Sequence, residues 1–260
     1  MRSVNVLEST VLHASDQLFW LDGSTAENTS DMRRINGRIS LSLTESPRDL
    51  SIREGAGKTV FWRQVQSSLI DGSPDEAEKT FTSPGTYTLA GVATDPTGRY
   101  LPRALSVNAG DSPPQGHMVT LYPTPVSVRF NSAGGLKLTL ARDADDTPLP
   151  WAIITVIISI PGLGNQSYRA QSDQHGDVLL PFLRLPPLPE GVDDYNATLS
   201  VRGADAATSK QPENPDDFSP MKAGHPDNAS FSESIGFSVV PGELSTLRSD
   251  GRNFLAIKPV

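Results

Sequence analysis

The sequence contains no cysteine. Disulfide bonds, thiolate metal sites and cysteine nucleophiles are therefore excluded, and packing and hydrogen bonds must stabilise the fold without covalent cross-links. Histidine is also scarce, and the four in the chain are His13, His117, His175 and His225. None of them forms a His-x-x-x-His or His-Glu-x-x-His pair, which is the spacing that a zinc site on one helix needs. No metal site is predicted.

Positive charge is in deficit. The 22 lysines and arginines stand against 30 aspartates and glutamates, so the formal net charge is −8. A surface that binds nucleic acid must be basic, and this balance argues against one. Long apolar runs are missing as well. The longest, residues 151–160, is interrupted by Thr155 and Ser159, and it is much shorter than the roughly 20 residues of a membrane helix. Neither nucleic-acid binding nor membrane insertion is expected.

Motifs for catalysis and for cofactor binding are lacking. No Gly-x-Ser-x-Gly segment indicates a serine hydrolase. Residues 55–59 (Gly-Ala-Gly-Lys-Thr) match the end of a phosphate-binding loop, but the full motif needs another glycine where Ile52 stands. We therefore predict that the chain is not an enzyme, that it has no catalytic residues and that it binds no cofactor.

The clearest pattern that is present is a two-residue alternation. Residues 39–43, 136–140 and 195–201 alternate between apolar and polar side chains, which places one set on each face of a half-buried strand. Residues 151–160 are apolar on both faces and rich in β-branched side chains, as in a central strand. The 21 glycines and 22 prolines indicate frequent turns, and no convincing amphipathic helix is found. The prediction is an all-β protein.

Two antiparallel β-sandwich domains in tandem, immunoglobulin-like or transthyretin-like, would account for these short strands. We expect the first to span residues 1–116 and the second residues 117–260, with residues 108–116, rich in Gly, Pro, Ser and Asp, as the linker. Residues 203–230 contain five acidic residues and four prolines. They are predicted to form a long polar insertion in the second domain, of the kind that is functional or disordered.

The second domain resembles the carboxypeptidase regulatory-like, or transthyretin-like, β-sandwich family. The matching segments are residues 136–141, the acidic turn 143–146, residues 148–152 (Pro-Leu-Pro-Trp-Ala) and residues 172–177 (Ser-Asp-Gln-His-Gly-Asp) before the strand at 178–182. The family usually has glycine in the first turn and again just before the alanine, where this chain has Asp146-Thr147 and Trp151. The resemblance covers about 55 residues and implies a fold without an activity.

Proteins of this make-up look similar to accessory parts of phage tails and contractile injection systems. The resemblance implies a structural or adaptor subunit of a larger assembly, whose partners are other protein subunits. The first 13 residues lack a basic flank followed by an apolar run, so we expect no signal peptide. The chain would be made in the cytoplasm and then become part of a particle.

Large apolar side chains are the expected contacts with a ligand or a neighbouring subunit. The candidates are Trp62, Tyr100, Tyr122, Phe218, Phe254, Leu255 and Ile257. The last three belong to the C-terminal strand, which we expect to pair with a neighbouring subunit through an exposed sheet edge.

Two alternatives remain open. The chain could be a carbohydrate- or surface-binding module, because sugar rings stack on exposed aromatic side chains such as Trp62. The carboxylates of residues 143–146 (Asp-Ala-Asp-Asp) could also hold a calcium ion, although Pro148 stands where an EF-hand loop needs glycine.

Overall fold

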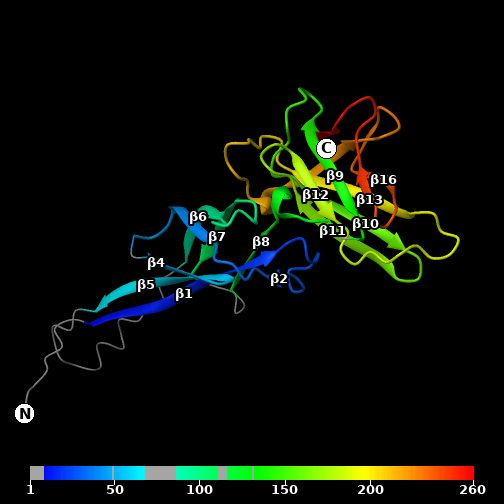
Figure 1. Cartoon of the computed structure of the whole chain (residues 1–260). Coiled ribbons are helices and arrows are strands. Elements are labelled where there is room, and N and C mark those ends of the chain that lie inside the picture. Colours follow the sequence, from blue (N-terminus) through cyan, green and yellow to red (C-terminus); the bar gives the residue numbers. More distant parts are fainter. Residues whose placement is uncertain (1–8, 49, 68–85, 111–115, 131) are drawn as a thin grey trace, which may run out of the picture.

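A computed structural model of the chain describes residues 9–48, 50–67, 86–110, 116–130 and 132–260, with the backbone alone at 9–15 and 63–67. This part of the chain is all-β, as predicted: its only helical elements are two 3₁₀ turns, η1 (Pro125–Ser127) and η2 (Pro215–Asp217). No helix in the described ranges is long and apolar enough to cross a membrane. The strands gather into two lobes joined near β8 (Figure 1).

The first lobe consists of two facing sheets. One has the order β2-β1-β5-β4, and β8 pairs with β1 in parallel. The other has the order β3-β6-β7. The strands are β1 (Ser9–Asp22), β2 (Arg33–Arg34), β3 (Ser40–Glu45), β4 (Leu50–Gly55), β5 (Lys58–Ser67), β6 (Tyr87–Thr94), β7 (Arg103–Ala109) and β8 (His117–Leu121).

The core of the first lobe lies between these sheets. Trp20 of β1 and Phe61 of β5 are fully buried and contact Leu89 of β6 within one cluster. The Trp20 indole Nε1 donates a 3.0 Å hydrogen bond to the Thr59 hydroxyl, so its polar atom is satisfied inside the core. Alternation along β1, β5 and β6 therefore brings together side chains that lie far apart in sequence.

The expected domain boundary at residues 116–117 falls inside this lobe. β8 is hydrogen-bonded beside β1, from Leu18–His117 to Asp22–Leu121, and Val119 and Leu121 are buried in the first core. A parallel partner about 100 residues away leaves no local signal in the sequence. The boundary therefore lies after β8, while residues 111–115 of the expected linker are outside the described residues.

The second lobe contains a single continuous path of paired strands, β11-β10-β13-β14-β18-β9-β12, with β15, β16 and β17 attached to β14, β13 and β9. The strands are β9 (Gly135–Arg142), β10 (Ile153–Ile160), β11 (Gly164–Gln171), β12 (Asp177–Pro181), β13 (Tyr195–Gly203), β14 (Ser219–Gly224), β15 (Phe231–Ser232), β16 (Ser234–Val239), β17 (Leu244–Thr246) and β18 (Leu255–Pro259). The two ends of the path, β11 and β12, lie next to each other, so the sheet wraps around its own core.

The predicted central strand is confirmed. β10 lies between β11 and β13, and its residues Ile154, Val156 and Ile158 are fully buried. They pack in one cluster with Leu136 and Leu140 of β9 across the core. Each fully buried aliphatic side chain contributes about 1.5–3 kcal/mol, and these layers supply most of the stability that a chain without disulfides requires.

The prediction that residues 203–230 form one long polar insertion is wrong. The segment includes η2 and β14, and β14 lies in the sheet between β13 and β18. Met221 and Ala223 point into the second core and are buried, while Lys222 between them is not. Three alternating positions among prolines and acidic residues are too few to be recognised as a strand from sequence.

Two positions at which this chain departs from the family's usual glycines have left-handed backbones. Asp146 has φ 56° and Trp151 has φ 65°, a region that glycine adopts most easily. These are the positions where the family usually has glycine. Trp151 is held there by packing and by its indole, which donates a 2.8 Å hydrogen bond to the Thr208 carbonyl.

A carboxylate connects the two sheets of the first lobe. Glu54 of β4 accepts hydrogen bonds from the Leu41 N–H of β3, at 2.9 Å, and from Arg38 Nε, at 2.8 Å. Burial by itself would raise the pKa of Glu54, but these hydrogen bonds, together with the charge of Arg38, outweigh it and hold the pKa below its ordinary value. The ionised carboxylate is therefore the form that the folded state favours.

Replacing Glu54 with glutamine should lower the free energy of unfolding by about 1–2 kcal/mol at pH 7. Because the folded pKa of Glu54 is depressed, its contribution is complete above the unfolded pKa of about 4.3 and is lost as pH falls further. Urea unfolding at pH 7 and pH 3 should show the difference between the two proteins shrinking at the lower pH. Glu45→Gln, at an exposed residue of β3, is the control. A difference that is equal at both pH values would contradict the role of the charge.

Candidate functional site

The two lobes are joined through a buried arginine. Arg103 of β7 is 2% exposed. Its Nη1 donates to the Thr120 carbonyl and hydroxyl of β8, at 2.9 and 2.8 Å. Its Nη2 donates to Asn214, at 3.1 Å, and to the Asp216 carboxylate in the second lobe. One guanidinium thus connects β7, β8 and the η2 turn.

Burial lowers the pKa of Arg103, and the neighbouring Asp216 carboxylate partly restores it. A buried arginine loses its hydration, a penalty of several kcal/mol that only good geometry and charge pairing offset. Four hydrogen bonds from the two Nη atoms, one of which is also the ion pair with Asp216, supply that compensation here, while Nε is buried without a partner among the described residues. The backbone adds a further link, because the Ala104 N–H donates to the Glu213 carbonyl at 3.2 Å.

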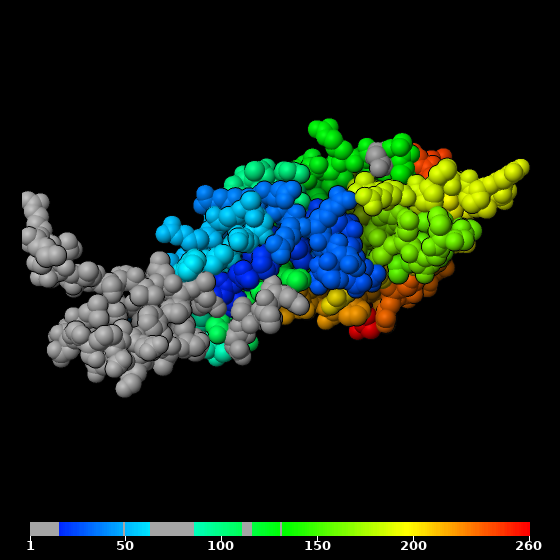
Figure 2. Space-filling model, turned by 90° about the horizontal axis from the view of Figure 1, so that it is seen from below, coloured from blue at the N-terminus to red at the C-terminus, as the bar shows by residue number. Residues whose placement is uncertain are grey.

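An apolar cluster lies beside this arginine, and we call the two together the lobe junction. Its members are Leu101 and Tyr122 from the first lobe and the connection after it, with Trp151, Ile153, Ala207 and Phe218 from the second lobe. All six side chains are at least nine-tenths buried. A buried apolar cluster shared by two domains restricts their relative motion, so the two lobes form one rigid unit. In Figure 2 the blue atoms of the first lobe lie against green and yellow atoms of the second without a visible gap on that face.

The junction creates a pocket, which we call the junction pocket, with a volume of about 250 Å³. The first lobe contributes Ser24, Thr25 and Arg33, and the connection contributes Pro123 and Val128. The second lobe contributes residues 166–170 of β11 and residues from β12 and its exit, Leu179, Leu180, Pro181, Leu183 and Arg184. Both lobes are therefore needed to form it.

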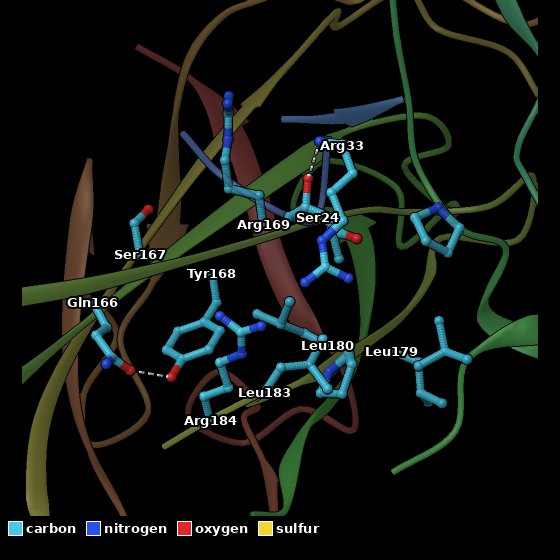
Figure 3. Close-up of a pocket in the computed structure, with 15 residues that line it drawn as sticks. Ser24, Arg33, Gln166, Ser167, Tyr168, Arg169, Leu179, Leu180, Leu183 and Arg184 are labelled. Atoms are coloured by element: carbon cyan, nitrogen blue, oxygen red, sulfur yellow. Dashed lines mark hydrogen bonds between the residues drawn. The ribbon is translucent and has the colours of Figure 1, made fainter. Parts of the chain in front are cut away.

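Two guanidinium groups extend into this pocket from opposite walls. Arg33, from β2, and Arg184, from the exit of β12, point toward one another above Tyr168 and Leu180 (Figure 3). Arg184 has φ 65°, an unfavourable backbone conformation for a residue with a Cβ. Neither arginine forms an ion pair with another described residue.

A third arginine adds positive charge beside the pocket. Arg169 and Ser167 extend to the other side of β11 from Tyr168 (Figure 3). The Arg169 Nη1 donates a long hydrogen bond, 3.4 Å, to the Glu27 carbonyl of the first lobe. Its Nε and the Ser167 hydroxyl are buried without a hydrogen-bond partner among the described residues. The pocket and its surroundings are thus rich in unused donors.

Four of the seven expected contact residues are interior. Tyr122 and Phe218 are 2% and 4% exposed in the lobe junction, while Leu255 and Ile257 are 0% and 1% exposed in the second core. β18 pairs with β14 on one side and β9 on the other. The expectation that the C-terminal strand offers a free edge is therefore wrong, because its apolar residues pack inside the sheet instead of facing a neighbour.

The other three candidates are partly exposed. Trp62 is half-buried on β5. Tyr100 donates from its hydroxyl to Asp22 at 3.0 Å, and burial, reinforced by the charge of Asp22, raises the pKa of Tyr100. Phe254 lies under the Arg252 guanidinium, 5.3 Å from ring centroid to Cζ. The structure does not bring these three residues together as one site, since they lie on β5, in the loop before β7 and in the loop just before β18.

The candidate calcium turn is occupied by protein groups. Arg252 pairs with Asp143, at 2.9 Å, and with Asp146, while Asp145 accepts from the Thr147 hydroxyl and N–H. These carboxylates close the turn and hold the C-terminal loop. Among the residues that the structure describes, no cluster of three or more His, Asp or Glu side chains suits a metal ion.

The two pocket arginines, Arg33 and Arg184, are not among the contact residues predicted from the sequence. Arg33 is followed by Arg34, and Arg184 stands between two leucines directly after a strand. A basic residue that interrupts an apolar strand exit is the one local signal that could have drawn attention to the pocket.

Comparisons with known proteins assign no family. No family model matches the chain, and no curated protein matches it. Two solved structures are weakly similar. BcpA, the major pilin subunit of Bacillus cereus, has 11% identity and a TM-score of 0.22 over 95% of this chain and 61% of its own. The pilus adhesin RrgA of Streptococcus pneumoniae has 10% identity and a TM-score of 0.24 over 91% of this chain and 29% of its own. This chain spans less than two thirds of either protein, and scores this low establish no shared function.

The junction arginine leads to a test by double-mutant cycle. Asp216→Ala leaves the Arg103 charge buried with fewer acceptors and should lower the free energy of unfolding by about 1–3 kcal/mol. Arg103→Met replaces the charge with an apolar chain of similar length, so the double variant should be no less stable than Asp216→Ala alone. Urea unfolding followed by tryptophan fluorescence measures all four proteins, since Trp151 lies in the junction.

Asp205→Ala is the matched control, because Asp205 is exposed on the same segment and its carboxylate has no hydrogen bond among the described residues. Additive effects of the Arg103 and Asp216 substitutions would show that the pair does not connect the lobes.

Proposed function

We propose that this chain is a non-enzymatic structural or adaptor subunit of a larger protein assembly, such as a phage tail or a contractile injection particle. The observation that carries the proposal is the lobe junction. It fixes two sandwiches in one orientation through a buried arginine and an apolar cluster. A spacer needs this rigidity, because a subunit that bends at its linker transmits neither position nor force.

The pairing of the charged and histidine side chains with other protein groups supports the same proposal. The described acidic clusters and histidines are engaged in local contacts: Asp143 and Asp146 with Arg252, and His117 with Asp16 at 3.1 Å. Such pairs stabilise loops and strand ends. Two sandwiches with packed interiors leave their outer surfaces for contacts with other subunits, and the partners we propose are therefore proteins.

The rigid-subunit proposal predicts how the native chain sediments. In lysate of the source cells, an antibody against the chain should find it in fast-sedimenting particles in fixed ratio to their other proteins. Asp216→Ala, which loosens the junction, should reduce incorporation several-fold, whereas Asp205→Ala should not. A chain that sediments as a free monomer in every growth condition, or an Asp216→Ala variant that is incorporated normally, would contradict the proposal.

A carbohydrate-binding function is the second candidate, and Trp62 is the observation that favours it. Of the three tryptophans, Trp20 and Trp151 are buried, at 0% and 4% exposure, and Trp62 is partly exposed. A sugar stacked on that ring would bind through its apolar face.

Trp62→Ala should then abolish binding on a glycan array while the melting temperature stays within a few degrees of the parent. Trp62→Phe should keep part of the binding, because it preserves a flat ring. If the parent protein binds no glycan, or if Trp62→Ala binds as well as the parent, this second function is excluded.

A further inference from the structure

We propose that the junction pocket binds a carboxylate attached to an apolar group. This inference is independent of the structural role proposed above and rests on the pocket alone. The site belongs to both lobes, since Arg33 comes from the first and Arg184 from the second.

The charge of the pocket is the first argument. The whole chain carries eight more acidic than basic residues, yet the 15 residues lining the pocket include three arginines and neither aspartate nor glutamate. Clustered guanidinium groups repel one another unless an anion lies between them. Arg33 and Arg184 form no ion pair within the described part of the chain, and we infer that a bound ligand supplies the anion.

The geometry selects a planar anion. Arg33 and Arg184 extend toward one another from facing walls (Figure 3). A guanidinium presents parallel N–H donors that match the two oxygens of a carboxylate, and two guanidiniums can hold one carboxylate by both edges. The hydroxyls of Ser24 and Thr25 are already used, because they donate to Asp22 at 2.6 and 2.7 Å. The Ser167 hydroxyl extends to the other side of β11 (Figure 3), so the arginines are the side chains left to recognise the anion.

The floor of the pocket selects an apolar body. Below the arginines lie Leu180, Leu183 and the ring of Tyr168, and Leu183 is 48% exposed although it is a large aliphatic residue. The Tyr168 hydroxyl donates to Gln166 at 2.6 Å, which leaves the ring as the surface toward the pocket. A volume of about 250 Å³ suits a group the size of a benzene ring or a leucine side chain. Inorganic phosphate would leave this floor unused.

The backbone at Arg184 is the independent observation. Its φ of 65° is unfavourable for any residue with a Cβ, and strain of this kind is concentrated at binding sites. Glycine would relieve it at once, as it does at Gly191 a few residues later, where φ is 80°. The chain keeps an arginine in the strained position, and that conformation directs its guanidinium over the pocket.

The test is a titration of the whole chain with benzoate, followed by two-dimensional NMR of backbone and arginine side-chain N–H groups. We expect saturable shifts confined to the pocket residues, with a Kd on the order of 1 mM. Benzamide, which has the same shape without the charge, should bind at least tenfold more weakly. Acetate, which has the charge without the ring, should also bind at least fivefold more weakly.

Three variants identify the groups responsible. Arg33→Gln and Arg184→Gln should each weaken benzoate binding about tenfold, and Arg53→Gln, at an exposed arginine of β4 outside the pocket, should leave it unchanged. Arg184→Gly should weaken binding equally while the melting temperature stays the same or rises, because the strain is removed. Both pocket arginines are exposed, so these variants are expected to fold.

The source of the carboxylate is resolved by two more ligands. N-acetyl-leucine represents a small free acid, and a tripeptide ending in leucine with a free carboxylate represents the end of a partner chain. Tighter binding of the tripeptide supports a chain end, and tighter binding of N-acetyl-leucine supports a small acid. Equal binding of benzoate and benzamide, tighter binding of inorganic phosphate than of benzoate, or benzoate binding that survives both glutamine substitutions would overturn the proposal.

Discussion

The Arg103 guanidinium is the interaction on which the arrangement of this molecule depends. It extends from β7 to the point where β8 and η2 meet, and it donates to acceptors on both of those elements. A charge in such a place is tolerated only while every partner stays in position. If the lobes separated, the guanidinium would keep only its contacts with Thr120. The ion pair with Asp216 and the apolar cluster around Trp151 therefore depend on each other. The junction pocket is lined by residues of both lobes, so it is complete only while the lobes are docked.

The fold could be predicted from sequence wherever the determining interactions are local or periodic. Alternation located β3, β9 and β13, and the doubly apolar stretch located β10 as a central strand. Prediction failed where pairing is distant. β8 joins β1 across nearly 100 residues, and β14 enters the second sheet from a segment rich in acid and proline. Period and turn chemistry describe what one strand looks like, and they contain no information about which strand lies beside it.

The candidate site could not be predicted for a related reason. The same alternation marks an edge strand and a central one, so Leu255 and Ile257 looked available while they are core residues between two paired neighbours. Large aromatic side chains were expected at a surface, and Tyr122 and Phe218 are instead used to join the lobes. Arg33 and Arg184 become neighbours only after both sandwiches have formed and docked. When a site is formed by residues from two separately folding units, the sequence contains no motif of fixed residue spacing that could reveal it.

The position of the pocket connects ligand binding to the rigidity of the whole body. Its walls come from both lobes, so a ligand that occupies it binds the docked arrangement and not the separated one. Thermodynamic linkage then requires that ligand binding stabilise the docked lobes by the same free energy by which docking strengthens ligand binding. At a ligand concentration 100 times the Kd this amounts to about 2.7 kcal/mol, comparable with the contribution expected of the Arg103–Asp216 pair. On the two proposals made above, a spacer built in this way would be stiffest with its pocket filled, and Arg33 and Arg184 would then become part of the connection between its halves.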